Sequence, residues 1–138
     1  MDLAADACWA RLRAADHGVL ATRHEARGVD AVPVVFAVAD DRIAIPIDTV
    51  KPKTTARLAR LGNIAADARV TLLVEHYDDA DWTQLWWVRA HGHAVEAART
   101  DEWQRALAAK YPAYRDAAAI TSLIVITVAG VSGWVSGS

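Results

Sequence analysis

Apolar residues recur along this chain in short runs, mostly with the two-residue period of β-strands. The ranges with this pattern are residues 19–22, 31–38, 42–47, 68–75, 86–97 and 120–128. Turn-forming residues bound them, and residues 24–30 predict a hairpin between the first two ranges. Pro33 and Pro46 fall inside two of the ranges. Because proline has no backbone N–H for a strand ladder, both are predicted at a sheet edge or a bulge.

Helical spacing is confined to three short stretches, and each begins at a residue that commonly caps helices. The predicted helices are residues 2–15 with Asp2 as cap, 54–61 with Thr54 as cap and Gly62-Asn63 as stop, and 100–110 with Thr100 as cap. Six strands in meander order with short helices predict a mainly β protein, an antiparallel β-barrel with helical decoration. No repeat or low-complexity linker divides residues 1–138, so one domain is expected.

The overall charge balance excludes one class of partner. Fifteen Lys and Arg face 17 Asp and Glu in 138 residues, a net charge of −2, whereas nucleic-acid binders carry a basic surplus. The most apolar stretch, residues 117–129, is far shorter than the ~20 residues of a membrane span, and residues 1–6 lack the features of a secretory signal. The single cysteine, Cys8, excludes an internal disulfide and is expected to be a buried, inert thiol. A cytoplasmic protein is therefore expected, with neither nucleic acid nor membrane as partner.

Charge is segregated locally although it nearly cancels overall. Residues 51–61 hold four cations and no acid, whereas residues 75–81 hold four acids and no Lys or Arg. The cations are Lys51, Lys53, Arg57 and Arg60, and the acids are Glu75, Asp78, Asp79 and Asp81. A helix that starts at Thr54 would offer free backbone N–H groups and the hydroxyls of Thr54 and Thr55 beside these cations. This arrangement predicts a phosphate site, and the alternative is a solvated helix with ordinary cations.

The cationic stretch also carries a family resemblance. Residues 51–64 (KPKTTARLARLGNI), 68–79 (ARVTLLVEHYDD) and 82–90 (WTQLWWVRA) resemble the pyridoxamine 5′-phosphate oxidase-like proteins. They look most like the actinobacterial branch that uses the deazaflavin coenzyme F420. Shorter matching pieces flank them at residues 32–36, 109–112 and 132–134. The resemblance covers nearly the whole chain.

This resemblance implies an FMN-binding-like split β-barrel of six to seven antiparallel strands. It also implies a homodimer with two cofactor sites at the subunit interface. Carried over by position, Lys53 is the lysine that holds the cofactor phosphate. The residues implied to assist it are Lys51, Thr54, Thr55 and Arg57, and those implied to back the ring system are Pro33, Val34, Phe36, Asp48 and Thr49.

Three of the six tryptophans fall within residues 82–87. Alternation along a strand places Trp86 and Trp87 on opposite faces, so both cannot point into one small barrel core. Core packing is the ordinary expectation for each, but at least one is predicted to meet a partner chain, a ring cofactor or solvent. Trp87 is included among the candidate cofactor contacts.

Other polar patterns predict no further chemistry. His91 and His93 share one face of a predicted strand, and His76 is a candidate to approach them, but no carboxylate or cysteine completes a ligand set. No metal site is therefore expected. Gly130 and Val131 stand where the resembled subfamily usually has an arginine and an additional aromatic residue, which implies a lost cofactor contact. Neither a nucleophile elbow nor a Gly-rich dinucleotide fingerprint is present.

The resemblance, together with the predicted phosphate site, implies an F420-dependent oxidoreductase. In this interpretation the reduced cofactor supplies hydride to a small conjugated or quinone-like acceptor, and the protein contributes binding, orientation and water exclusion. One alternative is an FMN-dependent oxidase or reductase on the same barrel. The other is a non-catalytic protein that binds or carries the cofactor.

Overall fold

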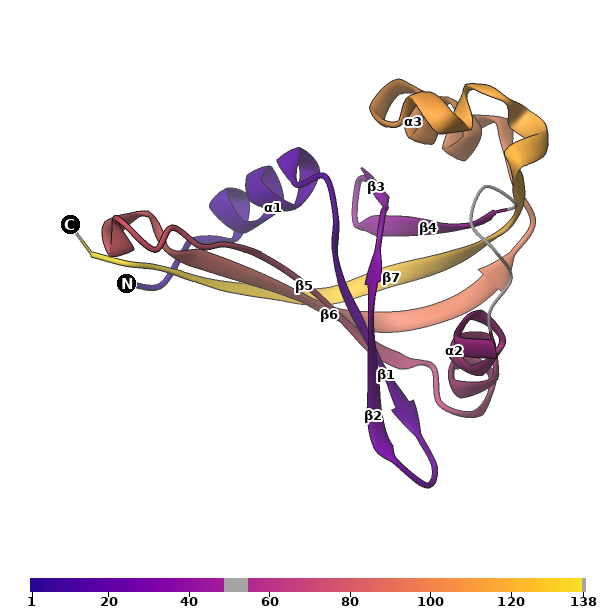
Figure 1. The fold of residues 1–138 in the computed structure, drawn as a ribbon, viewed down its shortest axis with the longest axis horizontal. Helices are drawn as coiled ribbons and strands as arrows, with labels where there is room; N and C mark the ends of the chain where they lie inside the picture. The colour runs from indigo at the N-terminus through magenta and orange to yellow at the C-terminus, as the bar shows by residue number, and fades with distance from the viewer. Residues whose placement is uncertain (49–54, 138) are drawn as a thin grey trace.

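The structure is a computed structural model, and it describes residues 1–48 and 55–137, the side chains of residues 55–58 excepted (Figure 1). The strands are β1 (Gly18–His24), β2 (Gly28–Val34), β3 (Ala37–Ala39), β4 (Arg42–Asp48), β5 (Arg69–His76), β6 (Trp86–Ala97) and β7 (Ile120–Val135). The helices are α1 (Ala5–Ala14), α2 (Thr55–Ala66) and α3 (Asp101–Lys110), with short 3-10 turns η1 (Trp82–Gln84), η2 (Pro112–Arg115) and η3 (Ala117–Ala119). The protein is therefore mainly β, as predicted.

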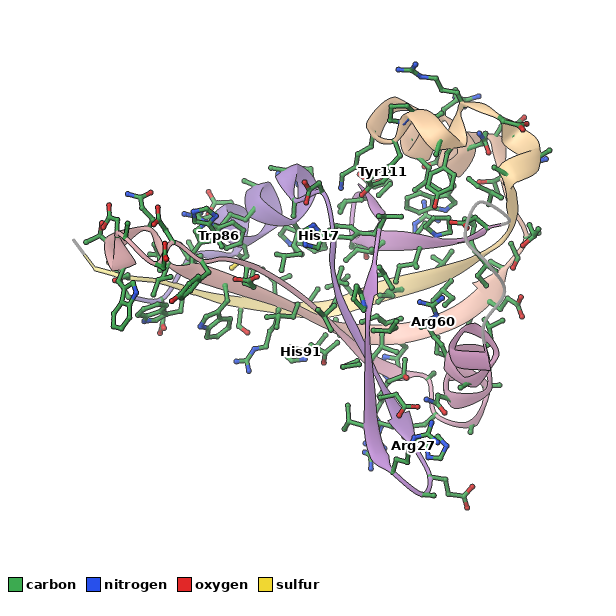
Figure 2. The ribbon with its side chains drawn as sticks, viewed as in Figure 1. His17, Arg27, Arg60, Trp86, His91 and Tyr111 are labelled. Atoms are coloured by element: carbon green, nitrogen blue, oxygen red, sulfur yellow. The ribbon has the colours of Figure 1, made fainter. Side chains whose placement is uncertain are left out.

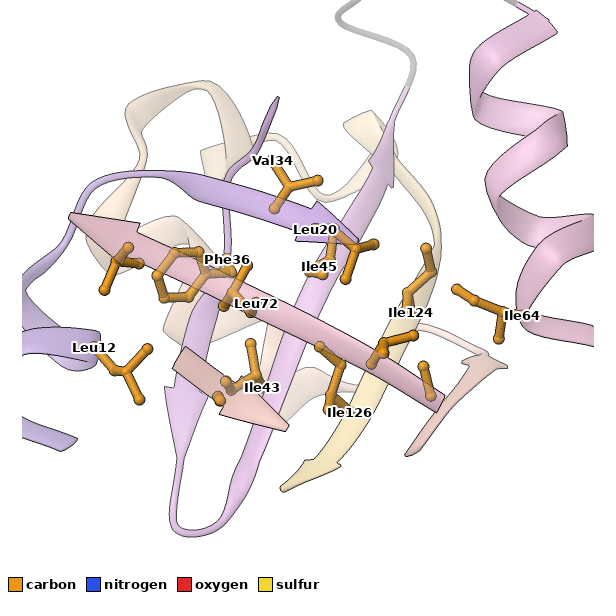
Figure 3. Packing of buried hydrophobic residues seen from close by; sticks show 14 of the residues in the cluster. Leu12, Leu20, Val34, Phe36, Ile43, Ile45, Ile64, Leu72, Ile124 and Ile126 are labelled. Atoms are coloured by element: carbon orange, nitrogen blue, oxygen red, sulfur yellow. The ribbon is translucent and has the colours of Figure 1, made fainter. Parts of the chain in front are cut away.

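All strand pairs are antiparallel and belong to one sheet, in the order β2-β1-β5-β6-β7-β4-β3. The two ends of this sheet bend toward each other, because Leu20 of β1 and Val34 of β2 share a core with Ile43 and Ile45 of β4 (Figure 3). β2 and β3 are edge strands in this order, so the barrel is split rather than fully closed. This confirms the predicted split barrel, with seven strands.

The helices occupy different parts of the barrel. α1 buries Cys8 and Leu12 against the sheet, while α2 lies at the other end and contributes Ile64 to the core (Figure 1). α3 and the turns after it form a second cluster around Trp103 and Leu107. The chain ends lie together, since the Met1 amino group donates to the Val135 carbonyl at 2.9 Å. Among the described residues, no helix combines the length and the hydropathy that crossing a membrane requires.

Both prolines in strands have the positions expected from their missing N–H. Pro33 lies in the edge strand β2. Pro46 pairs with Leu123 of β7, and on its other side the ladder with β3 ends at Ala44. β6 and β7 meet at a bulge after His91, where a Cβ on Gly92 would overlap the carbonyl oxygen of Thr127. Only glycine allows the two long strands to approach this closely.

Several predicted boundaries were wrong. The first helix begins at Ala5 without a side-chain cap, because Asp2 instead forms a β-bridge with Trp134. The apolar range 31–38 is two strands, β2 and β3, interrupted at residues 35–36. The last strand continues beyond residue 128 to Val135, since its C-terminal half pairs with the first half of β6.

α2 also runs past its predicted stop, to Ala66. The Gly62-Asn63 pair does not end the helix, because the Asn63 side chain is occupied elsewhere. Its amide nitrogen donates to Thr22 and Asp30 in the β1–β2 hairpin. An asparagine held in this way has no need to cap the helix C-terminus.

The Thr100 cap of α3 is confirmed, and it gives a first testable prediction. Its hydroxyl accepts a hydrogen bond from the Trp103 amide at 3.2 Å. Thr100→Ala is expected to lower the free energy of unfolding by about 1 kcal/mol, because that amide loses its partner. Urea unfolding measures the change. Thr100→Ser keeps the hydroxyl and should behave like wild type, and an equal loss in both variants would contradict the capping role.

Candidate functional site

The predicted phosphate site is flanked by two described elements. β4 ends at Asp48 and α2 begins at Thr55, so a helix N-terminus follows the lysines within a few residues. Such a terminus offers free N–H groups and the positive end of the helix dipole to an anion. Four predicted site residues lie outside the described residues, namely Thr49, Lys51, Lys53 and Thr54. Thr55 and Arg57 are placed in the first turn of α2 by their backbone alone.

Asp48 is buried at the end of β4, with 4% of its surface exposed. Its carboxylate accepts a hydrogen bond from the hydroxyl of Tyr114, which is also buried and belongs to η2. Burial and the neighbouring carboxylate raise the pKa of Tyr114 well above its usual value, so the phenol remains a donor. The pair fixes the end of β4, shortly before residues 51–61, which we call the cationic segment.

A polar network joins α2 to the β1–β2 hairpin. Asn63 donates from its amide nitrogen to Thr22 Oγ1 at 3.0 Å and to Asp30 Oδ2 at 2.8 Å. Arg27 makes two hydrogen bonds to the same carboxylate, at 3.0 and 2.7 Å. The guanidinium of Arg27, assisted by Asn63, lowers the pKa of Asp30 to about 2. Asp30 therefore remains a carboxylate and is already satisfied by its partners.

Between this hairpin and α2 lies a hollow of about 230 Å³. It is lined by Thr22, Arg27, Asp30, Ala31, Val32, Ala59 and Arg60. Figure 2 shows Arg27 on the hairpin and Arg60 beside α2. The hollow is thus lined by the guanidinium groups of Arg27 and Arg60 and by the carboxylate of Asp30, which is bound to Arg27.

The Arg27–Asp30 pair predicts a pH effect on stability. Its carboxylate titrates at about 2 in the native state and at 3.8 ordinarily. The stabilisation is therefore complete above about pH 4 and is lost as the pH falls through 2. The urea concentration at the midpoint of unfolding is measured from pH 6 to pH 2. It should fall less steeply with decreasing pH in Asp30→Asn than in wild type. Asp79→Asn, at an exposed turn, is the control, and parallel curves for Asp30→Asn and wild type would contradict the assignment.

The crossover between β2 and β3 is held by the end of α3. Lys110 Nζ donates to the Phe36 carbonyl at 2.9 Å and lies 4.2 Å from the centre of the Phe36 ring. The Tyr111 hydroxyl accepts a hydrogen bond from the Phe36 amide at 3.2 Å. It also lies 2.9 Å from two carbonyl oxygens, those of Phe36 and Asp16, and donates its proton to one of them. Burial lowers the pKa of Lys110 and raises that of Tyr111. Both side chains thus hydrogen-bond to the backbone of Phe36.

The structure separates the residues that the resemblance assigned to the ring system. Pro33 is exposed on β2, whereas Val34 and Phe36 are buried in the core cluster (Figure 3). Because both are buried, Val34 and Phe36 can pack beneath residues that contact a cofactor ring, but they do not form the surface of the barrel. Their contact with a cofactor stays a prediction.

The two adjacent tryptophans face opposite sides of β6, as alternation requires. Trp86 packs against the core cluster and beneath Arg11, whereas Arg89 lies 4.4 Å from the ring centre of Trp87 on the other side. Trp82 is outside the strand, in η1. Trp86 lies in the part of the sheet that is close to both chain ends, and this part is far from Arg60 (Figure 2). Within one chain, therefore, the structure does not bring Trp87 together with α2.

Neither the histidines nor the cysteine forms a site among the described residues. His91 and His93 are exposed on the same face of β6, and His91 Nδ1 lies 3.0 Å from Thr71 Oγ1. The expectation that His76 approaches them was wrong, since it pairs with Trp86 and stacks on its ring at 6.3 Å. Within residues 1–48 and 55–137, no three His, Cys, Asp or Glu side chains gather as metal ligands. Cys8 is fully buried as predicted, and burial raises the pKa of its thiol.

Comparison with family models decides the classification of the chain. Residues 4–134 match the model described as pyridoxamine 5′-phosphate oxidase. The chain belongs to the pyridoxamine 5′-phosphate oxidase family. This confirms the resemblance at the level of the family. No curated protein matches the chain.

Solved structures share the fold of this family member at low sequence identity. An FAD-binding protein from Mycobacterium smegmatis is 19% identical, with a TM-score of 0.65 over 97% of this chain and 96% of that one. An FAD-binding protein from Mesorhizobium loti is 20% identical, with a TM-score of 0.68 over 96% and 95% of the two chains. A conserved hypothetical protein from Mycobacterium tuberculosis is 16% identical, with a TM-score of 0.75 over 97% and 86%. At these identities the likeness establishes the split-barrel fold.

Sequence reasoning missed the side chains that support the candidate site of this family member. They are Tyr114, which holds Asp48, and Asn63 and Arg27, which hold Asp30. Lys110 and Tyr111 were noted only as part of a short matching piece, residues 109–112. That piece was the one available signal for them, because nothing in the sequence pattern pairs α3 with the β2–β3 crossover.

Proposed function

We propose that this protein is an oxidoreductase that binds coenzyme F420 as a homodimer and reduces a small conjugated or quinone-like acceptor. When bound, a reduced deazaflavin would supply the hydride for this reduction. The chain itself would bind the phosphate, orient the ring and exclude water. The proposal needs no strong acid or base from the protein.

The observation that carries the proposal is the start of α2 at Thr55, which follows Lys51 and Lys53 directly in the sequence. Lys51, Lys53 and the helix N-terminus can then act on one phosphate through charge-assisted hydrogen bonds. Buried Asp48, held by Tyr114, supports the segment at its other end. The hollow beside α2, which Arg27 and Arg60 line, is the place that we propose for a second anionic group, such as the acidic tail of a deazaflavin.

That hollow is too small for a whole cofactor, and the resemblance implies that the ring lies at a subunit interface. About 230 Å³ accommodates a phosphate or a short tail, whereas pockets for whole small molecules span roughly 300–1,000 Å³. A ring system therefore needs another surface. Trp87 is far from α2 in its own chain but is accessible to a partner, so we propose that the partner's Trp87 contributes to the ring site.

A second candidate is an FMN- or FAD-dependent enzyme on the same barrel. It is favoured by the family itself and by the two similar structures that are described as FAD-binding proteins. Recognition of the phosphate would be the same for both kinds of cofactor. The departures at Gly130 and Val131 from the F420-using pattern also fit this alternative.

Cofactor titration distinguishes these proposals. Purified protein is titrated separately with F420, FMN and FAD while cofactor or tryptophan fluorescence is followed. Micromolar binding of F420 and weaker binding of the flavins is the expected result. Binding of FMN or FAD alone would overturn the F420 proposal and favour the second candidate.

Catalysis needs a separate measurement. Oxidation of reduced F420 is followed with a panel of quinones, with and without the protein. Acceleration by catalytic amounts of protein is expected. Tight binding without turnover on any acceptor would instead identify a cofactor carrier.

A further inference from the structure

The turn of the β1–β2 hairpin is closed by a side chain that can gain a proton. β1 ends at His24 and β2 begins at Gly28, and these two residues are paired across the ladder. His24 Nδ1 accepts hydrogen bonds from the backbone N–H groups of Ala26 at 3.0 Å and Arg27 at 2.9 Å. The imidazole thus has the place that an Asn or Asp side chain ordinarily takes in such a turn. Gly28 completes the turn with a φ of 91°, a conformation that favours glycine.

Only the neutral form of this imidazole can accept these two hydrogen bonds. A neutral ring carries its hydrogen on one nitrogen and accepts at the other, so the hydrogen is here on Nε2. In an imidazolium both nitrogens are donors, and the Nδ1–H group would then face two further N–H donors. Histidine side chains ordinarily gain their proton at about pH 6.5. Protonation of His24 in mild acid therefore removes the acceptor that closes the turn.

The turn is connected to α2 through one carboxylate. Arg27, whose amide donates to His24, also makes two side-chain hydrogen bonds to Asp30, at 3.0 and 2.7 Å. The same carboxylate accepts a hydrogen bond from Asn63 of α2 at 2.8 Å. Arg27 and Asp30 line the hollow of about 230 Å³ between the hairpin and α2, and Figure 2 shows Arg27 at the end of the hairpin. The backbone of the turn thus positions one wall of this hollow.

Charged side chains from the hairpin and from the α2–β5 connection lie around His24. They are Arg23, Glu25, Arg27, Asp30 and Asp67. Two arginines already bind Asp67, which shares a hollow of about 430 Å³ with His24. The pKa of Asp30 is lowered by Arg27 above all and also by a charge on His24, so an imidazolium here attracts this carboxylate. Protonation of His24 therefore acts on Arg27 twice, because it removes the acceptor of the Arg27 amide and adds a second cation that competes for Asp30.

We propose that His24 is a pH-sensitive switch of the β1–β2 hairpin. The neutral imidazole closes the turn and keeps Arg27 on Asp30, whereas the protonated imidazole opens the turn and loosens this wall of the hollow beside α2. In the open state, water replaces the imidazole as the acceptor for the amides of Ala26 and Arg27. The switch acts through the hairpin alone, so the inference goes beyond the proposed function and does not depend on it.

NMR spectroscopy of the full chain without added cofactor tests the switch from about pH 8 to about pH 5, a range that spans the ordinary titration of histidine. Protection of the Ala26 and Arg27 amides against hydrogen exchange, corrected for the intrinsic effect of pH, is expected to fall about fivefold as His24 titrates, the scale of one hydrogen bond. The resonances of Arg27 Nε–H and of the Asn63 side-chain amide should shift with the same midpoint as the His24 ring protons. Unchanged protection of the two amides would overturn the proposal. Resonances of Arg27 and Asn63 that stay fixed, or that follow another midpoint, would also overturn it.

Three variants assign the response to His24. His24→Asn supplies an oxygen acceptor that does not titrate in this range, so its turn should stay closed at every pH. His24→Ala has no acceptor, and its two turn amides should be unprotected at every pH. His17→Asn removes another exposed histidine, beyond the opposite end of β1, and should keep the wild-type response. A response that persists in His24→Asn or disappears in His17→Asn would overturn the proposal, and this contrast decides alone if His24→Ala does not fold.

Discussion

Replacing Phe36 by alanine is expected to lower the free energy of unfolding by about 3–5 kcal/mol. Its side chain is fully buried among the largest residues of the core, between the two ends of the curved sheet (Figure 3). Removing the ring leaves a cavity and also takes away the aromatic face beneath Lys110. Urea unfolding measures the loss.

The control for this prediction is Val29→Ala, at an exposed position of the edge strand, which should change stability by no more than about 0.5 kcal/mol. Phe36→Leu should lie between the two, because it keeps most of the buried volume. The resemblance assigned Phe36 to the ring system, so the two roles make opposite predictions. A Phe36→Ala variant with normal stability and lost cofactor affinity would place the ring at the binding surface and contradict the packing role.

The strands were the predictable part of this fold. The pattern of residues 86–97 predicted β6 to the residue, and buried and exposed side chains alternate strictly from Val88 to Val95 within it. The run 31–38 shows why the remainder was harder. Every residue in it except Pro33 is compatible with a strand, and the break at residues 35–36 exists because the chain passes from one sheet edge to the other. That break is stabilised by Lys110 and Tyr111, about 75 residues away in sequence.

The stop predicted for α2 failed for a related reason. Gly62-Asn63 is a pattern of adjacent residues that commonly ends a helix. Such a pattern ends the helix only where no contact with residues distant in the sequence competes with it. Asn63 instead donates to Thr22 and Asp30, which are 41 and 33 residues away. The candidate site also has one part that the sequence predicts and one that it does not. The cations of residues 51–60 were predictable, because they form a local excess of positive charge in the sequence. The Tyr114–Asp48 pair, 66 residues apart, becomes visible only in the fold.

The cationic segment carries the most direct test of cofactor binding. Lys53→Ala is expected to weaken F420 binding by about 1.5–3 kcal/mol, the scale of a charge-assisted hydrogen bond to a phosphate oxygen. This corresponds to a roughly ten- to hundredfold higher Kd by fluorescence titration. FMN titrated in parallel should weaken by the same factor, because the lysine is proposed to contact the phosphate that both cofactors carry.

Two matched variants separate this contact from general electrostatics. Arg105→Ala removes an exposed cation of α3 and should leave the Kd unchanged, whereas Lys53→Arg keeps the charge and should lose less affinity than Lys53→Ala. Thermal unfolding is expected to stay at the wild-type value in all three variants, so that an affinity change reports on the site. An unchanged Kd in Lys53→Ala would remove this lysine from the phosphate site. A loss as large in Arg105→Ala would show that net charge, rather than a contact at the start of α2, governs binding.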